Sequence, residues 1–575
     1  MTDDFLRAPL LLTLRCDGVD YDLPLGQTSF YDRFYVDTTL ETGHHFRRLR
    51  LVVHPKAAVA LEALAVSQPM TYRPTDRLLA NGFQSWSETR AYAPGAAVPR
   101  LRAVARPFMG RSGDEHLDWV PRGPGQLHSW TYTTRRAAAG THHLVGSLGE
   151  RTCFTCHVHD VPAGRLRVLA DVAGLTLEHS FPLLDLYWTT GTAAEVYDRY
   201  FALLPRPVAP GPPVLGWTSW YRHYTGVSAA IVRDNLAQWQ AAALPPGVIQ
   251  IDDGWQARVG DWLSFDEAFP AGVAELARAI SAAGHRPGLW LAPFLAEAKS
   301  ELVRQHPDWL LRDTHGRPLR VLYNPGWSGW CYALDVYHPG VRDYLTAVLV
   351  TITERWGFGL LKLDFLYAAC LVAPPGKTRG QVMSDAVSLL IDLCGDAQLL
   401  GCGVPLGSVF GRLAYCRTGA DIHLRWEHRA LALVRHRERV STRVALRTVL
   451  YRYPLDGRAF GVDPDVYLLR DDGQHLTPTQ QYTVLLVNAL CGRLLFTSDG
   501  VGAYGAEQRG ELAELRYWAT ARVHDLEELR PDVFRLAVRR AGEEYAALIN
   551  LTGKAQEVAG VALVAYESLV VKVRV

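Results

Sequence analysis

Aspartates recur at the points where predicted strands end. Asp252 and Asp253 close one strand, Asp364 closes another, and Asp421 follows a third. In a barrel of parallel strands, catalytic groups project from the carboxyl ends of the strands. A carboxylate at one strand end is often a helix cap or a loop clamp, but three such ends facing one mouth favour chemistry. The chemistry that paired carboxylates support is acid–base and nucleophilic catalysis.

The spacing of Lys362 and Asp364 is the most informative of these signals. Residues i and i+2 of a strand share a face, so both side chains are predicted to enter the mouth of a barrel. A nearby ammonium keeps a carboxylate ionised, which suits a nucleophile; the structural alternative is a buried Lys–Asp ion pair. Glycoside cleavage also needs a protonated carboxyl group. Asp421 could supply it, although Arg417 could instead hold Asp421 ionised.

Aromatic residues accompany these strand ends. The chain has 16 Trp and 25 Tyr, and rings of this kind often form the walls of carbohydrate sites. Trp255, Trp262 and Trp290 lie close in sequence to the ends of the second and third predicted strands, although each alone is more often part of a core. The Asp252–Asp253 pair could accept hydrogen bonds from sugar hydroxyls beneath such walls.

Other catalytic motifs fail. Residues 375–378 (PGKT) end like a phosphate-binding loop, but Leu371 stands where its first glycine belongs. The sequence contains neither HExxH nor GxSxG. Cys153, Cys156, His157 and His159 cluster in sequence, but on a strand Cys156 would point away from the others, which argues against zinc. We therefore expect no metal and no organic cofactor, because two carboxylates suffice for the chemistry.

The elements that must position these residues change character along the chain. Residues 1–204 carry short alternating runs such as 10–14, 45–53, 126–133 and 166–172, which predict an antiparallel β-sandwich. Residues 205–213 (PRPVAPGPP) read as a stiff linker. Residues 214–527 then alternate strands with helices, which predicts a (β/α)8 TIM barrel in preference to a doubly wound open sheet. Residues 528–575 alternate again and predict a small antiparallel β-domain.

The barrel prediction names its strands and several helices. The predicted strands are 214–220, 248–252, 286–293, 359–364, 398–402, 415–419, 459–463 and 493–496. The predicted helices between them are 228–243, 271–283, 341–356 and 382–393.

Composition excludes several classes of protein. The 575 residues are 48% hydrophobic and 21% charged, as in an ordinary globular protein. A net charge of +1 gives no field that would attract nucleic acid or a membrane surface. The start MTDDFLRAP is acidic and lacks a secretory apolar core, and the apolar runs are too short to span a bilayer. We expect a cytoplasmic protein with free thiols, since its nine Cys form no repeated CxxC pairs. Nothing in the sequence indicates an oligomeric state.

Several short strings together resemble glycoside hydrolase family 36, most closely its compact bacterial α-galactosidases. They are NGFQSW (81–86), GWTSWY (216–221), IDDGW (251–255), GLWLAPF (288–294), LKLDFLYA (361–368), GCGVPLG (401–407) and RTGAD (417–421). The resemblance implies a retaining double displacement with Asp364 as nucleophile and Asp421 as acid/base. It further implies a sugar pocket formed by Trp86, Trp220, Tyr221, Asp252, Asp253, Trp290, Lys362, Cys402 and Arg417.

The resemblance also implies a substrate class. We expect an exo-acting α-galactosidase on small galactosides such as melibiose or raffinose, and the paired aspartates favour galactose over an N-acetylated sugar. Two alternatives are a galactosyl transferase of the raffinose- or stachyose-forming type and a catalytically silent sugar-binding barrel. One departure stands out: residues 422–440 (IHLRWEHRALALVRHRERV) carry more arginines than the family pattern. We expect this stretch to affect the leaving-group side of the site.

Overall fold

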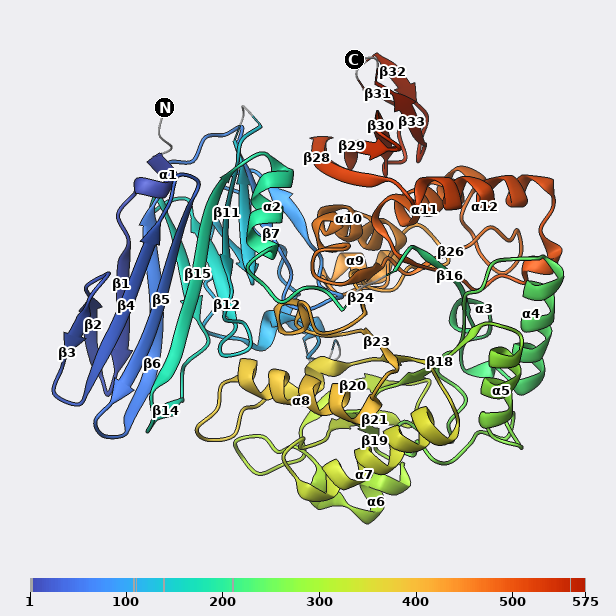
Figure 1. Cartoon of the computed structure of the whole chain (residues 1–575), viewed down its shortest axis with the longest axis horizontal. Coiled ribbons are helices and arrows are strands. Elements are labelled where there is room, and N and C mark those ends of the chain that lie inside the picture. The colour runs from blue at the N-terminus through green and yellow to red at the C-terminus, as the bar shows by residue number, and fades with distance from the viewer. Residues whose placement is uncertain are drawn as a thin grey trace.

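The computed structural model describes residues 4–106, 109, 111–137, 140–208, 211–558 and 560–573. Three groups of sheets follow one another along the chain: two large antiparallel sheets, one parallel sheet wrapped by helices, and a small antiparallel sheet at the end (Figure 1). Of the predicted linker 205–213, residues 209 and 210 lie outside the described residues.

The first two sheets pack against each other through one apolar cluster. Buried side chains alternate with half-buried ones along β5 (Phe46–Pro55), which is the pattern of a strand with one face on a core. One sheet has the order β2 (Val19–Leu23), β1 (Leu11–Cys16), β6 (Val59–Pro69), β13 (Arg165–Ala170), β12 (Thr155–Asp160), β9 (Gln126–Trp130), with β14 (Thr176–Leu177) paired to β6. The other has the order β3 (Thr28–Phe30), β4 (Phe34–Thr42), β5 (Phe46–Pro55), β15 (Phe181–Gly191), β11 (His142–Ser147), β10 (Tyr132–Arg136), β7 (Arg77–Ala80), β8 (Arg90–Tyr92). We call these two sheets the N-terminal sheet pair.

The alternating run 126–133 is divided between two strands, β9 and β10. Thr131 has a φ of 67°, which breaks the extended conformation, and the chain passes there from β9 in one sheet to β10 in the other.

The parallel sheet contains a strand at each of the eight predicted positions. Its order is β25 (Gly461–Asp463), β24 (Tyr415–Arg417), β23 (Gln398–Gly401), β22 (Leu360–Leu363), β18 (Arg286–Leu291), β17 (Val248–Ile251), β16 (Val214–Thr218), β27 (Leu494–Thr497), β26 (Val466–Tyr467). Only Pro464 and Asp465 separate the two edge strands β25 and β26 in the chain, so the sheet is curled. The first predicted strand ran to Trp220, but β16 stops at Thr218 and Trp220 begins α3 instead.

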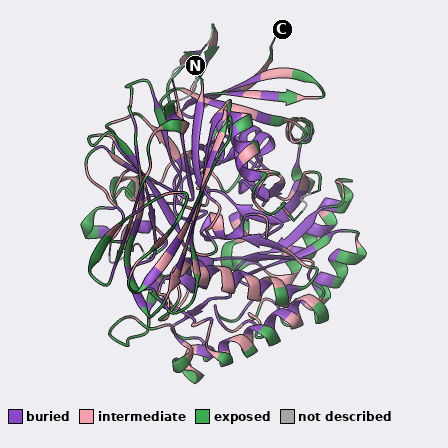
Figure 2. Ribbon diagram, turned by 60° about the vertical axis from the view of Figure 1, so that its left-hand side comes forward, coloured by how far each residue is buried: buried purple, intermediate pink, exposed green. Residues whose placement is uncertain are grey.

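Helices cover the outer side of this sheet, and their outward faces are exposed while the strands are buried (Figures 1 and 2). The helix predicted over 341–356 is α7 followed by a π-helical turn, Thr351–Arg355. The helices of the described residues are α1 (Asp4–Arg7), α2 (Ala193–Phe201), α3 (Trp220–His223), α4 (Ala229–Ala241), α5 (Ala274–Ala282), α6 (Glu301–Gln305), α7 (Pro339–Val350), α8 (Arg379–Cys394), α9 (Arg429–Leu433), α10 (Thr442–Tyr451), α11 (Pro478–Cys491) and α12 (Ala506–Trp518).

Two smaller sheets complete the chain. A three-stranded sheet, β19 (Leu295–Glu297), β21 (Gly329–Ala333) and β20 (Arg320–Asn324), is inserted after β18. The last sheet contains β28 (Arg522–Arg530), β29 (Val533–Arg540), β30 (Glu543–Asn550) and β33 (Ser568–Lys572), beside the pair β31 (Gln556–Val558) and β32 (Val561–Leu563). The predicted boundary at 527/528 falls inside β28, because this first strand of the sheet begins at Arg522.

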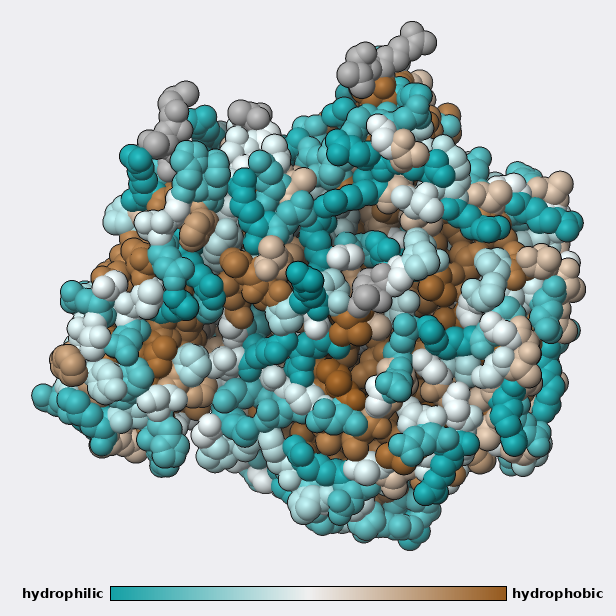
Figure 3. Space-filling model, in the orientation of Figure 1, coloured by the Kyte–Doolittle hydropathy of each residue, from teal (hydrophilic) through white to brown (hydrophobic). Residues whose placement is uncertain are grey.

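The surface mixes hydrophilic and hydrophobic residues, with apolar ones gathered toward the centre of the face in Figure 3. Within the described residues, no helix has the length and apolar character required to cross a membrane.

Candidate active site

A cavity of about 260 Å³ lies where the carboxyl ends of the parallel strands meet the N-terminal sheet pair. Eight of the predicted site residues line it: Trp86, Trp220, Asp252, Asp253, Trp290, Lys362, Asp364 and Asp421. The other lining residues are Asn324, Trp327, Phe365, Ala420, Glu438 and Val440. The fold therefore brings the four aspartates together in one cavity, as their places after the strands predict.

Asp364 follows β22 directly and is held in one orientation. The indole Nε1 of Trp290 donates to its Oδ2 at 3.0 Å, and the Phe365 amide donates to its Oδ1 at 2.9 Å. Phe365 has a φ of 55°, in the left-handed region that bulky residues rarely adopt. This turn directs the Phe365 amide back onto the carboxylate. The two donors thus fix the orientation of the Asp364 carboxylate.

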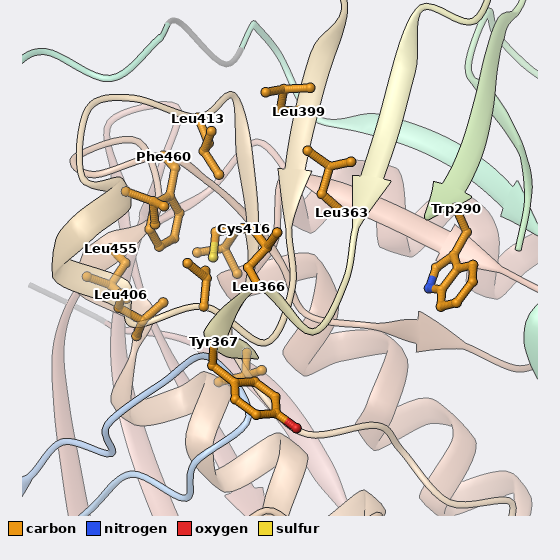
Figure 4. Close-up of a cluster of buried hydrophobic side chains, with 14 of the residues drawn as sticks. Trp290, Leu363, Leu366, Tyr367, Leu399, Leu406, Leu413, Cys416, Leu455 and Phe460 are labelled. Atoms are coloured by element: carbon orange, nitrogen blue, oxygen red, sulfur yellow. The ribbon is translucent and has the colours of Figure 1, made fainter. Parts of the chain in front are cut away.

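Trp290 is buried and belongs to the apolar cluster beneath the site. Figure 4 shows Leu363, Leu366 and Tyr367 packed with other buried side chains, while the Trp290 indole extends from the end of β18. Its Nε1 is the atom that reaches Asp364. Packing thus holds both the strand ends and the indole, which also lines the cavity.

Lys362 pairs with Asp252 in place of the expected Asp364. Its Nζ lies 2.9 Å from Asp252 Oδ2, and both side chains are buried. The opposite charges of Asp252 and Asp364 oppose the effect of burial and together raise the pKa of Lys362. Gln250 Nε2 also donates to the same Asp252 oxygen at 2.7 Å. The ammonium is thus shared electrostatically by two carboxylates, with the hydrogen bond going to Asp252.

Asp253 receives two donors from outside the parallel strands. Gln256 Nε2 donates to Oδ1 at 2.6 Å, and Trp327 Nε1 donates to Oδ2 at 2.8 Å. Burial nevertheless raises the pKa of Asp253 to about 6, and the neighbouring Asp252 acts in the same direction.

Asp421 is the most accessible of the four aspartates, with a side chain 38% exposed. Arg417 Nη1 donates to its Oδ1 at 3.1 Å. Desolvation in the cavity, helped by the negative charges of Asp364 and Asp252, raises the pKa of Asp421 above its ordinary value against the pull of Arg417 and Lys362. The sequence left open whether Asp421 holds a proton or is kept ionised by Arg417, and the raised pKa favours the first of these.

Three predicted site residues lie behind the cavity wall and do not line it. Arg417 is 3% exposed and bonds Asp421, while the thiol of Cys402 accepts from Trp86 Nε1 at 3.1 Å. The hydroxyl of Tyr221 donates to Asp465 Oδ2. Arg417 and Cys402 thus contact residues that line the cavity, and Tyr221 lies one step further away, since Asp465 in turn pairs with Arg417.

Sequence reasoning missed the lining residues that come from loops. Trp327 lies in the turn between β20 and β21, and Glu438 lies in the arginine-rich stretch. Neither follows a strand of the parallel sheet. The excess of arginines was the one available signal for the second of them.

No metal site is found among the described residues. Cys153 belongs to one apolar core cluster and Cys156 to another. His157 is buried, and desolvation lowers its pKa to about 3. The sequence cluster of cysteines and histidines is accordingly part of the core of the N-terminal sheet pair.

A comparison with known families gives one match, the melibiase family, over residues 219–375. That range contains Trp220, the Asp252–Asp253 pair, Trp290 and the Lys362–Asp364 motif. The chain contains a melibiase domain.

Solved structures extend the similarity beyond the melibiase domain. The α-galactosidase TtGalA from Thermus thermophilus, solved with p-nitrophenyl α-D-galactopyranoside, is 29% identical with a TM-score of 0.70; the match covers 93% of this chain and 98% of that one. The family 36 α-galactosidase AgaA from Geobacillus stearothermophilus shares the fold at 13% identity and a TM-score of 0.58, over 99% of this chain and 86% of that one. The resemblance to family 36 is confirmed.

Curated relatives match about a third of the chain. "A type blood alpha-D-galactosamine galactosaminidase" from Flavonifractor plautii is 32% identical over 35% of this chain and 19% of its own length. "Alpha-galactosidase 2" from Pediococcus pentosaceus is 28% identical over 32% of this chain and 25% of its own length. The matched segments thus span a quarter or less of these two relatives.

Proposed function

We propose that the protein is a retaining exo-α-galactosidase that removes terminal α-D-galactosyl residues from small galactosides such as melibiose and raffinose. The observation that carries the proposal is the single cavity shared by a carboxylate with fixed donors, Asp364, and an accessible carboxyl group of raised pKa, Asp421. This is the pairing that retaining glycoside cleavage requires. The similarity to TtGalA over nearly its whole length supports the choice of galactose.

The first half-reaction uses both carboxyl groups. The Asp364 carboxylate attacks the anomeric carbon and forms a β-galactosyl ester, while the bond to the leaving oxygen breaks and its electron pair stays with that oxygen. Asp421 donates its proton to the same oxygen, so the leaving sugar departs as a neutral alcohol. The hydrogen bond from the Trp290 indole to Asp364 Oδ2 weakens in this step, because the carboxylate loses its negative charge as the ester forms.

The second half-reaction restores the enzyme. Asp421, now ionised, takes a proton from water as that water attacks the anomeric carbon, and the ester bond to Asp364 breaks. The product is α-galactose, because two inversions give net retention. Arg417 stabilises the ionised form of Asp421 that this step requires.

The sugar hydroxyls are assigned to the buried end of the cavity. Asp252 and Asp253 accept hydrogen bonds, Lys362 donates, and Trp86, Trp220 and Trp290 form apolar walls. Tyr221, Cys402 and Arg417 support these groups from behind.

In this proposal the parallel sheet closes as a (β/α)8 barrel over 214–527, with a β-sandwich at 1–204 and a β-domain at 528–575. The protein acts in the cytoplasm, without cofactor, on a small-molecule substrate.

The test is a proton NMR time course with p-nitrophenyl α-galactoside. We expect α-galactose to appear first and to mutarotate later. If β-galactose appears first, the mechanism is inverting and Asp364 acts as a base. If the galactosyl group appears only in transfer products when the acceptor sugar is present at high concentration, the transferase alternative holds. No turnover together with tight galactose binding would favour the sugar-binding alternative, and α-glucoside and α-galactosaminide controls would identify a different glycone.

The nucleophile is tested separately. Asp364→Ala should abolish turnover, and azide should then rescue it and yield β-galactosyl azide, because the small anion occupies the vacated face. Asp385→Ala is the matched control: this aspartate pairs with Lys377 away from the cavity, so its loss should leave turnover intact and unaffected by azide. Rescue that gives α-galactosyl azide would exclude Asp364 as nucleophile.

A further inference from the structure

The arginine-rich stretch 422–440 forms a loop that returns to the acid/base candidate. The Ser441 amide donates to the Asp421 carbonyl at 3.0 Å, which closes the loop at its base. The last residues of the loop therefore lie beside Asp421. Any group that Asp421 protonates leaves next to this part of the chain.

Side chains alternate along the returning end of the loop. Arg437 and Arg439 are buried, at 5% and 8% exposure, and face the protein. Glu438 and Val440, between and after them, line the cavity. This is the alternation of an extended segment with one face on a wall and the other on a pocket.

The two arginines anchor the segment to other parts of the fold. Arg437 Nη1 lies 3.2 Å from Asp114 Oδ1, and the Arg437 carbonyl accepts from the Glu88 amide at 3.2 Å. Arg439 Nη1 lies 3.8 Å from Glu88 Oε2, and its Nε lies 3.2 Å from Glu427 Oε1 within the same loop. Buried, doubly anchored arginines of this kind fix the residue between them in one place.

Glu438 itself is clamped on the side away from the cavity. Ser87 Oγ donates to its Oε1 at 2.6 Å. A Cβ on Gly113 would approach Oε2 to 2.8 Å, so the glycine permits the close fit. His436 Nδ1 lies 3.6 Å from Oε2, beyond hydrogen-bond reach. Because a carboxylate has about four acceptor positions, Glu438 retains acceptor capacity toward the cavity.

Glu438 lines the cavity from the loop 422–440, whereas the four aspartates follow strands of the parallel sheet. The charges that act most strongly on Asp421 are those of Arg417, Lys362, Asp364 and Asp252. Those that act on Glu438 are Arg437, Asp114 and Glu115, and burial raises its pKa to about 6. Glu438 thus belongs to the part of the chain that closes beside Asp421 and lines the cavity from there.

We propose that Glu438 is a specificity-determining residue that accepts hydrogen bonds from hydroxyl groups of the sugar attached through the cleaved bond. The inference rests on the proposed function, since it takes Asp421 as the group that protonates this sugar. A hydrogen bond to a charged acceptor is about twice as strong as a neutral one. Sugar leaving groups offer hydroxyl donors, whereas p-nitrophenol offers none once it is bound as a glycoside. Glu438 therefore favours oligosaccharides over aryl galactosides.

The experiment compares two substrates in Glu438→Gln and Glu438→Ala. For raffinose, kcat/KM should fall about tenfold or more, mainly through KM, because a hydrogen bond to a charged group is lost. For p-nitrophenyl α-galactoside, it should change less than about threefold, and inhibition by free galactose should stay the same. Ser87→Ala should also lower the ratio of kcat/KM for raffinose to kcat/KM for p-nitrophenyl α-galactoside, but by less. Asp385→Asn, at a carboxylate that pairs with Lys377 away from the cavity, is the matched control and should leave the ratio unchanged.

Binding separates this proposal from the function on which it rests. In an Asp364→Asn background, calorimetry should show weaker raffinose binding when Glu438→Gln is added and unchanged galactose binding. Equal losses for both ligands, or no loss for raffinose, would overturn the role of Glu438. A wild-type enzyme that cleaves neither substrate would overturn the proposed function, and the calorimetric comparison would still decide whether Glu438 contacts raffinose.

Discussion

Arg417 links the acid/base candidate to two further buried carboxylates. Its Nε lies 2.9 Å from Asp463 Oδ2, its Nη2 lies 3.1 Å from Asp465 Oδ1, and its Nη1 reaches Asp421. Asp465 Oδ2 also accepts from the Tyr221 hydroxyl and from the amide of Ile422, the residue after Asp421. Burial raises the pKa of Asp465, and the charge of Asp421 adds to this effect. The two carboxyl groups therefore titrate as a coupled pair.

At the residue scale, Asp465→Asn should move the alkaline limb of kcat/KM for melibiose to lower pH, by roughly half a unit to one unit. The sign follows from two effects: the negative charge that keeps Asp421 protonated is removed, and Arg417 is freed to stabilise ionised Asp421. With p-nitrophenyl α-galactoside the limb should move less, because a good leaving group needs little protonation. A limb that stays in place or moves to higher pH with melibiose would contradict the coupling.

At the element scale, strands were predictable and loops that enter the cavity were not. The apolar runs that end in Asp252, Asp364 and Arg417 form strands because their own sequence is buried on both faces of a parallel sheet. Trp327 reaches Asp253 only because β20 and β21 fold back over the site, and no local periodicity encodes that. The partner of Lys362 was missed for the same reason: Asp252 is 110 residues away.

The β20–β21 turn gives a prediction for Trp327→Phe. Loss of the indole donor removes a hydrogen bond that favours ionised Asp253, so the pKa of Asp253, now about 6, should rise. If ionised Asp253 binds galactose, the inhibition constant of galactose should then begin to increase at a higher pH as the solution is acidified. Trp330→Phe is the control, since this tryptophan of the same hairpin stacks on Arg320 instead. If the pH dependence of galactose inhibition does not shift in Trp327→Phe, the hydrogen bond from Trp327 to Asp253 does not affect sugar binding.

At the scale of the whole molecule, the cavity is formed jointly by the N-terminal sheet pair and the parallel sheet. Trp86 comes from the former, yet its indole donates to Cys402 and contacts Phe365 edge-on at 4.9 Å. Arg452, at the end of α10, is fully buried beside this contact. Its guanidinium donates to Asn81 Oδ1 and to the carbonyls of Gly82, Gln84, Ser85 and Thr418. One side chain thus ties the loop that carries Trp86 to the strand end that leads to Asp421.

Arg452→Lys should therefore lower both stability and activity. Lysine keeps the charge but has only three donors, so several buried carbonyls lose their partner and the free energy of unfolding should fall by about 2–4 kcal/mol. Arg458→Lys is the control: this arginine also bridges the two parts, through Asp198, but Asp198 is half exposed and the pair should contribute less than about 1 kcal/mol. Thermal unfolding and kcat/KM for p-nitrophenyl α-galactoside, measured well below the midpoint, distinguish the two effects. If Arg452→Lys loses stability but retains full kcat/KM, Arg452 holds the two parts together without positioning Trp86. If both stability and kcat/KM fall, Arg452 also positions Trp86 in the cavity wall.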